Sequence, residues 1–291
     1  MFGNKFAHYF AGCYLLFSLP CHAGPFAPAA GNSGSTAIAA SDPAIVAWAS
    51  GYGDYVAGAN VDAQFQTPLR ALNSAGNSDG NALGFIYDTV SLGEGGRITL
   101  SFERPIRNGE GADFAVFENS FSDTFLELAW VEVSSNGSDF VRFANYSLTT
   151  STTGPFGNID PSNISGYGGK YRGGYGTPFD LETLAGHPAL DLENIRYVRL
   201  IDIVGDGSAY DDMPTPAGPN PIYDPYPSAG SAGFDLDAVA VIHQSLALSE
   251  VNVPLPPGAL LLLAGMLLSA AASTTASRKK NNHPLNLNLE Q

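Results

Sequence analysis

Six segments in the middle of the chain alternate apolar and polar residues with a period of two, and this alternation is the strongest constraint on the fold. Clusters of Gly, Asn, Asp and Pro bound the segments, which span residues 96–102, 112–118, 127–134, 139–144, 195–203 and 234–242. A period of two is typical of β-strands with one buried face. Since no long helical pattern separates them, the sequence predicts an all-β protein, a β-sandwich with only short helices.

Turn and helix signals add detail to this sandwich, which is expected over residues 42–245. Asn136-Gly137 stands between two alternating segments and predicts a tight β-hairpin. Residues 44–49 are expected to form a short helix capped by Asp42, and residues 180–187 a second one capped by Asp180. The Gly- and Ser-containing residues 24–41 are expected to be a linker.

Residues 1–23 have the pattern of a secretory signal peptide with an apolar helix. Lys5 precedes the apolar stretch, and the small residue Ala23 marks a suitable cleavage point. A short N-terminal helix of the folded domain is the alternative. Both cysteines, Cys13 and Cys21, lie in this segment, so the exported protein is expected to contain neither a disulfide nor a thiol.

A second apolar segment lies near the C-terminus. Residues 258–277 carry no charge and approach the length of about 20 residues that a transmembrane helix needs. Arg278, Lys279 and Lys280 follow directly and form a basic stop. The excess of positive charge on the cytoplasmic side of membranes predicts that the C-terminus is cytoplasmic and that the domain lies outside.

The motif Val253, Pro254, Leu255, Pro256 and Pro257 precedes the apolar helix and the basic stop. This order of features in residues 253–280 resembles the PEP-CTERM class of bacterial sorting signals in its VPLPA-type variant. The resemblance implies an exosortase-like membrane protease as partner, transient anchoring in the inner membrane of a Gram-negative bacterium, and release to the cell envelope surface or the medium. Pro257 replaces the usual alanine, and a polar tail, 281–291, continues past the basic stop. A permanent membrane anchor is the alternative.

The charge of the middle of the chain restricts its partners. Of 28 acidic residues only Glu290 lies outside residues 24–257, whereas Lys5 and the three residues of the basic stop remove 4 of the 13 basic ones. The remaining domain is strongly acidic and would repel phosphate backbones and anionic lipid surfaces. Nucleic acid is therefore excluded as an expected partner.

Aspartates concentrate in the last part of the domain and predict a calcium site. Seven of them lie between residues 202 and 237, and no Lys or Arg occurs from Leu200 to Ser277. Calcium binds several hard oxygen ligands, which acidic loops can supply. The candidate ligands are Glu118, Asp202, Asp206, Asp235 and Asp237. A solvated acidic loop without metal is the alternative.

Strand parity places some of these carboxylates on apolar faces. A continuous alternation in 234–242 puts Asp235 and Asp237 on the face of Val239, and Glu118 similarly shares a face with Val116. A buried carboxylate needs a cation or hydrogen bonds. The alternative to a metal is a salt bridge to Arg199 or Arg142.

A glycine-rich segment, GYGGKYRGGYGTPFDL, predicts a carbohydrate site. Tyr167, Tyr171 and Tyr175 recur every four residues, with Arg172 between them. Exposed aromatic rings can stack on sugars such as those of an exopolysaccharide. Packing of these tyrosines against the sandwich is the alternative.

Four short stretches of the domain are RAL at 70–72, SLGEGG at 91–96, the 131–137 turn region and RYVRL at 196–200. With these stretches the domain resembles the galactose-binding, discoidin-like jelly-roll superfamily. From about Ser35 to Ile242 the chain is similar to uncharacterised secreted bacterial proteins that share stretches such as DFAVFENSF and SAGFDLDAV. The resemblance implies a jelly-roll fold but no activity.

These features favour a non-catalytic protein of the cell surface or extracellular matrix that binds calcium and polysaccharide. His187 and His243 have no nucleophile next to them in the sequence, and a zinc site would lack cysteine ligands. The alternative is a secreted glycan hydrolase that uses a carboxylate pair from Glu118, Asp202 and Asp237.

Overall fold

The computed structural model describes residues 24–76 and 88–245. The predicted signal peptide, the sorting motif, the helix 258–277, the basic stop and the polar tail lie outside these ranges. Within them, no helix is both long and apolar enough to cross a membrane.

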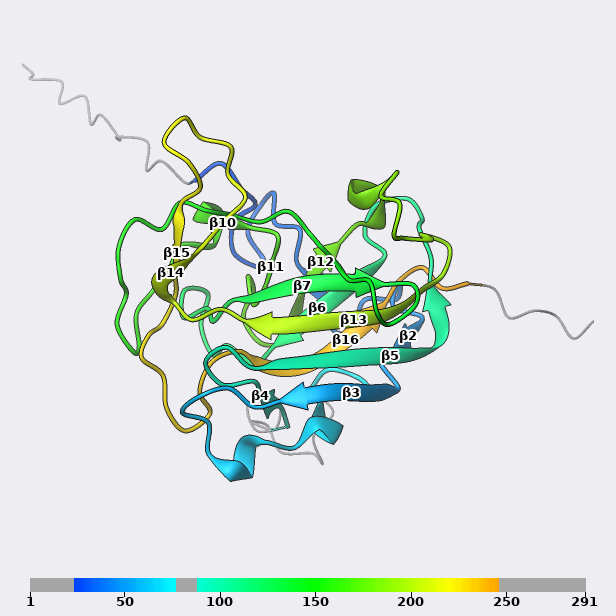
Figure 1. Ribbon diagram of the computed structural model, residues 1–291, viewed down its shortest axis with the longest axis horizontal. Coiled ribbons are helices and arrows are strands. Elements are labelled where there is room, and N and C mark those ends of the chain that lie inside the picture. The colour runs from blue at the N-terminus through cyan, green and yellow to red at the C-terminus, as the bar shows by residue number, and fades with distance from the viewer. Residues whose placement is uncertain (1–23, 77–87, 246–291) are drawn as a thin grey trace, which may run out of the picture. The chain divides into compact units, whose positions relative to one another are not determined.

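The described chain is built almost entirely from short strands joined by loops (Figure 1). The strands are β1 (Ile38–Ala39), β2 (Ala47–Trp48), β3 (Gly51–Val56), β4 (Val90–Ser91), β5 (Arg97–Ile106), β6 (Phe114–Glu118), β7 (Ala129–Ser134), β8 (Val141–Arg142), β9 (Tyr146–Ser147), β10 (Ile164–Ser165), β11 (Tyr167–Gly168), β12 (Tyr175–Phe179), β13 (Ile195–Asp202), β14 (Asp206–Tyr210), β15 (Pro221–Tyr223) and β16 (Asp235–Val241). The helices among the described residues are single 3-10 turns, η1 (Ala63–Phe65), η2 (Pro68–Ala71), η3 (Pro161–Asn163) and η4 (Leu181–Leu184).

Two antiparallel sheets of six strands form the sandwich. The β6 sheet has the order β1-β12-β6-β16-β2, with β4 beside β16, and the β13 sheet has the order β11-β7-β13-β5-β3, with β8 beside β7. One hydrophobic core joins the two sheets, with Leu100, Val131 and Val198 from the β13 sheet and Phe114 and Val239 from the β6 sheet. Each such side chain contributes about 1.5–3 kcal/mol on burial. The predicted all-β, two-sheet architecture is confirmed.

All six segments with period-two alternation contain strands of the structure. The predicted hairpin is also present: β7 and β8 pair antiparallel, with Glu132 opposite Arg142. Gly137 in the turn has φ +79°, a conformation that glycine adopts without strain. The local pattern therefore identified the central strands, whereas β3 and β12 lie in glycine-rich segments for which no strand was predicted.

Of the two predicted short helices, the first is wrong and the second is confirmed in part. Asp42 accepts the backbone N–H of Ala44 at 2.9 Å, as a cap would, but β2 then pairs with β16 and the chain stays extended. Sheet pairing has overridden the local helix signal. In the second segment Asp180 accepts the N–H of Glu182 at 2.9 Å and caps η4, a short 3-10 helix within the predicted range 180–187.

Residues 24–41, predicted as a linker, are packed against the sandwich. The backbone N–H of Gly24 donates to Ser162 Oγ at 2.7 Å, and β1 pairs with β12 at the edge of the β6 sheet. The folded domain therefore begins before residue 42.

An irregularity in β16 overturns the predicted arrangement of its faces. Continuous alternation places Asp235 and Asp237 on the face of Val239. The register with β6 instead shifts between Leu236 and Ala238, and Leu236 joins the same core cluster as Val239. One extra residue in a strand reverses the facing of every residue after it. The predicted shared face is therefore wrong.

Candidate functional site

The tyrosine-rich segment does not present a row of exposed rings. Tyr167 and Tyr171 are buried, and the Tyr171 hydroxyl lies 2.9 Å from Thr36 Oγ1. Tyr175 is half-buried beneath the Arg172 guanidinium, which lies 4.8 Å from the ring centroid. The alternative, in which the tyrosines pack this segment against the sandwich, is therefore confirmed for Tyr167 and Tyr171.

Four of the five predicted calcium ligands accept backbone N–H groups, and three of these, Asp202, Asp206 and Asp237, do so in separate places. Asp202 accepts hydrogen bonds from the N–H groups of Gly95 and Phe234, at 2.8 and 2.7 Å. Asp237 accepts the N–H of Gly76 with both carboxylate oxygens, at 3.1 and 3.0 Å. Asp206 is exposed and accepts the N–H of Ser208, two residues later.

The alternative of a solvated acidic loop is also wrong for most of these aspartates. Asp202, Asp211, Asp224, Asp235 and Asp237 are all at least 96% buried. Loops in a sandwich expose few regular backbone partners, so a buried carboxylate that accepts loop N–H groups satisfies donors that would otherwise be unpaired. Asp202, Asp211, Asp224 and Asp237 accept such N–H groups and thereby fasten loops to the sheets.

Asp211 is the clearest example of this role. Its Oδ1 accepts the N–H groups of Met213 and Asn220, at 3.2 and 2.6 Å, and its Oδ2 accepts the N–H of Ser147 at 2.8 Å. The side-chain amide of Asn220 adds a further bond to Oδ2 at 3.2 Å. One carboxylate thus ties the loop between β14 and β15 to β9.

The arginines proposed as partners of these carboxylates bind a different residue. Arg142 and Arg199 both pair with Glu132 on β7, with N–O distances of 2.9 and 2.7 Å. The predicted salt bridge to Glu118, Asp235 or Asp237 is therefore wrong. None of the salt bridges between described residues involves those three carboxylates.

Glu118 and Asp235, the other two predicted ligands, lie near one another at the end of β6 and the start of β16. Glu118 Oε2 accepts the N–H of Ser120 at 2.9 Å, whereas Glu118 Oε1 is buried and finds no hydrogen-bond partner in the described part of the chain. Asp235 accepts hydrogen bonds from the Ser91 hydroxyl and, at 3.2 Å, from the Asn119 amide. Across residues 24–76 and 88–245, no three His, Cys, Asp or Glu side chains are placed to hold one metal ion. Calcium binding stays a prediction.

A cavity of about 430 Å³ opens beside Asp235, and we call it the phenylalanine pocket. Its lining includes Phe65, Phe121, Phe125 and Phe156, which are exposed or half-buried and which we call the rim. It also includes the buried Glu127 and Asp235, which we call the floor. The Phe121 and Phe125 rings stack with centroids 4.6 Å apart, and Phe156 lies 6.3 Å from Phe125. Phe121 and Phe156 are 64% and 83% exposed, which is unusual for large apolar side chains.

The fold brings these residues together from separate loops. The connection from β6 to β7 crosses from one sheet to the other and carries Phe121, Phe125 and Glu127. Phe156 comes from the loop between β9 and η3, and Asp235 begins β16. The pocket therefore lies at the end of the sandwich where strands of both sheets terminate.

The two floor carboxylates have different surroundings. Burial raises the pKa of Glu127 well above its ordinary value, and the nearby Asp235 and Glu118 raise it further. Burial also raises the pKa of Asp235, to about 7, while hydrogen bonds from Ser91 and Asn119 oppose this rise. Glu127 is only 5% exposed, and no described side chain or backbone N–H donates a hydrogen bond to its carboxylate. The floor therefore holds two acidic groups that lack a positive partner.

Sequence reasoning missed Glu127 and the four phenylalanines. Glu127 was assigned to an alternating strand, and the phenylalanines belong to loops without periodicity. The available signal was the density of phenylalanine in residues 114–125, which exceeds what the core-facing positions of one strand require.

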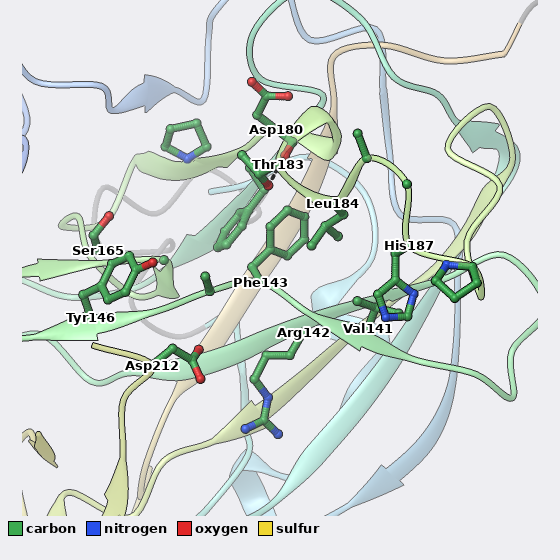
Figure 2. A pocket seen from close by; sticks show the side chains of 17 residues that line it. Val141, Arg142, Phe143, Tyr146, Ser165, Asp180, Thr183, Leu184, His187 and Asp212 are labelled. Atoms are coloured by element: carbon green, nitrogen blue, oxygen red, sulfur yellow. Dashed lines mark hydrogen bonds between the residues drawn. The ribbon is translucent and has the colours of Figure 1, made fainter. Parts of the chain in front are cut away.

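A larger and more open groove, of about 1020 Å³, lies over β8 and η4 (Figure 2). Figure 2 shows Phe143 near its centre, with Arg142 and Asp212 to one side. Arg142 is held by the ion pair with Glu132. Asp212 Oδ2 accepts the backbone N–H and the side-chain amide of Asn145, at 3.1 and 2.6 Å. Because these polar groups already have partners, the phenylalanine pocket is the stronger candidate site.

The chain matches no protein-family model and no curated protein at a significant level of similarity. The residues of the phenylalanine pocket therefore carry the functional inference.

Proposed function

We propose that the protein is a non-catalytic, exported protein of the bacterial cell surface or extracellular matrix, and that the phenylalanine pocket binds polysaccharide. The observation that carries the proposal is the combination of an exposed aromatic rim with two buried carboxylates in one cavity. Sugar rings stack on aromatic faces through their C–H groups, while acidic side chains accept hydrogen bonds from hydroxyls. This location replaces the tyrosine-rich segment as the proposed carbohydrate site.

Export, sorting and the finer fold complete the proposal. The signal peptide, the sorting motif and the basic stop support export and processing by an exosortase-like protease. The two antiparallel six-stranded sheets support a galactose-binding-like jelly roll.

Binding of the purified protein to the exopolysaccharide of its host, and to a glycan array, tests the proposal. Phe156→Ala should weaken binding about three- to tenfold, since an aromatic contact contributes about 0.5–1.5 kcal/mol. Tyr210→Ala is the matched control, because Tyr210 is also an exposed aromatic residue, 57% exposed, but lies on β14 and does not line the pocket. Equal binding by the two variants would contradict the proposed site.

Calcium is the second ligand in this proposal, and its candidate ligands are those expected from the sequence, Glu118, Asp202, Asp206, Asp235 and Asp237. Removal of calcium with a chelator, followed by its return at about 1 mM, a concentration typical of extracellular calcium modules, tests this part. Saccharide binding that is lost on chelation and regained with calcium would support it, and binding that is indifferent to both treatments would remove calcium from the proposal.

A secreted glycan hydrolase is the second candidate function. It is favoured by the two carboxyl groups in one cavity, of which only Asp235 receives side-chain hydrogen bonds. Such a difference can leave one carboxyl ionised and the other protonated, as glycosidases require. The pair would be Glu127 and Asp235 rather than the predicted Glu118, Asp202 and Asp237. Release of new reducing ends by the wild type, and its absence in Glu127→Gln, would establish hydrolysis.

A further inference from the structure

We propose that the phenylalanine pocket selects an amino sugar whose amino group is unacylated and protonated, with the ammonium placed between Glu127 and Asp235. This inference rests on the proposed polysaccharide-binding function and names its ligand class.

The floor of the pocket contains acidic groups to which a cation could bind. Glu127 and Asp235 are 95% and 96% buried and both line the cavity, and neither takes part in a salt bridge between described residues. The third carboxylate behind them, Glu118, has a buried Oε1 without a hydrogen-bond partner among the described residues. Buried charges in proteins are normally paired, because removing them from water is unfavourable. A ligand that brings positive charge would supply the pairing.

An ammonium group matches this floor because it donates hydrogen bonds and the carboxylates accept them. It donates three hydrogen bonds and accepts none, so it complements carboxylates that have free acceptor positions. It needs only one or two carboxylates, whereas calcium takes six to eight oxygen ligands. Charge-assisted bonds of this kind are roughly twice as strong as neutral ones.

The rim favours a sugar as the carrier of the ammonium. The exposed Phe121 and Phe156 offer aromatic surface on which the apolar side of a pyranose can stack, and aromatic ring faces also attract cations. The cavity of about 430 Å³ is within the range of about 300–1,000 Å³ that small-molecule sites occupy. N-acetylation of the amino group would remove its charge and two of its three hydrogen-bond donors while leaving the sugar ring unchanged. Comparison of the free and the acetylated amino sugar therefore distinguishes binding at the carboxylate floor from binding at the aromatic rim.

Isothermal titration of the purified full chain with glucosamine, N-acetylglucosamine and glucose, in the presence of a chelator, tests the inference. We expect glucosamine to bind at least about tenfold more tightly than the other two, because a hydrogen bond to a charged group contributes about 1.5–3 kcal/mol. Glu127→Gln should reduce glucosamine affinity by about tenfold or more. Glu110→Gln, a change at an exposed glutamate outside the pocket, should leave it unchanged.

Thermal melting of Glu127→Gln guards against loss of the fold, and the same titration with Phe156→Ala gives a second variant at a mostly exposed position. Equal affinity for glucosamine and N-acetylglucosamine, or full glucosamine affinity in Glu127→Gln, would overturn the inference, as would binding that requires calcium. If neutral saccharides bind and Phe156→Ala weakens them, the proposed function stands while the amino-sugar inference fails. If no saccharide binds either with the chelator or after calcium is returned, both fail.

Discussion

Replacing Asp211 by asparagine should destabilise the domain far more than the same replacement at the neighbouring Asp212. Both oxygens of Asp211 accept backbone N–H groups: Oδ1 takes those of Met213 and Asn220, and Oδ2 takes that of Ser147. An asparagine offers one acceptor oxygen and an NH₂ group, so at least one backbone N–H would face another donor.

The size of the effect follows from these contacts. A buried donor left without a partner costs about 1–3 kcal/mol, and a hydrogen bond to a charged group contributes about 1.5–3 kcal/mol. We therefore expect Asp211→Asn to lower the free energy of unfolding by about 2–4 kcal/mol. In a domain of about 200 residues each kcal/mol shifts the melting temperature by about 2–4 °C, so the shift should be about 4–16 °C.

Asp212→Asn is the control, because Asp212 accepts both of its hydrogen bonds from Asn145 with a single oxygen, Oδ2. An asparagine can keep that oxygen in place, so this variant should melt close to the wild type. Urea denaturation and thermal melting by circular dichroism measure both. Similar stability of the two variants, or a loss below about 0.5 kcal/mol for Asp211→Asn, would refute the view that buried aspartates fasten the loops.

Three further outcomes are expected. Burial raises the pKa values of Asp202, Asp235 and Asp237 to about 7, so the folded state binds more protons than the unfolded one between about pH 4 and 7. The contribution of these groups to stability is therefore fully present below about pH 4 and is lost as the pH rises through 7. Urea midpoints that increase from pH 5 to 8 would contradict this expectation. Gly233→Ala should destabilise the domain by more than about 1 kcal/mol, because Gly233 has a φ of +67° and the added Cβ would lie 2.4 Å from Asp202 Oδ1. A urea midpoint of this variant equal to that of the wild type would contradict the expectation. Intact mass and C-terminal sequencing of protein from the native host should place the terminus within residues 254–257, and retention of residues 278–291 in membranes would indicate a permanent anchor instead.

The sequence predicted the central strands because their alternation is local and is repeated in both sheets. It could not predict the bulge in β16, which reverses the facing of Asp235 and Asp237 relative to Val239 and depends on pairing with β6. Nor could it predict the extended path at residues 44–49, since the competing partner is β16, almost two hundred residues later.

The candidate site was predictable only in part. Glu118 and Asp235 were recognised as carboxylates that need a partner, but their shared neighbour Glu127 was hidden in an alternating segment. The hydrogen bonds of Asp202 and Asp237 join residues far apart in the chain, such as Gly76 and Asp237, so no spacing rule reveals them. The phenylalanine rim depends on how long loops close over the end of the sandwich, which is a property of the folded chain alone.

The position of β16 bears on how the domain responds to mechanical load. A pulling force transmitted through residues beyond Ser245 acts first on Ser245, whose N–H donates to the carbonyl of Pro105 and whose hydroxyl donates to that of Glu193. It then acts on the bonds just after the C-terminal end of β16. There the N–H groups of Ile242 and His243 both donate to the carbonyl of Asp113, and the His243 ring lies 2.7 Å from the Asp113 carboxylate. Asp235 is at the opposite end of the same strand. A tethered domain would thus yield at this latch before the force disturbs the phenylalanine pocket.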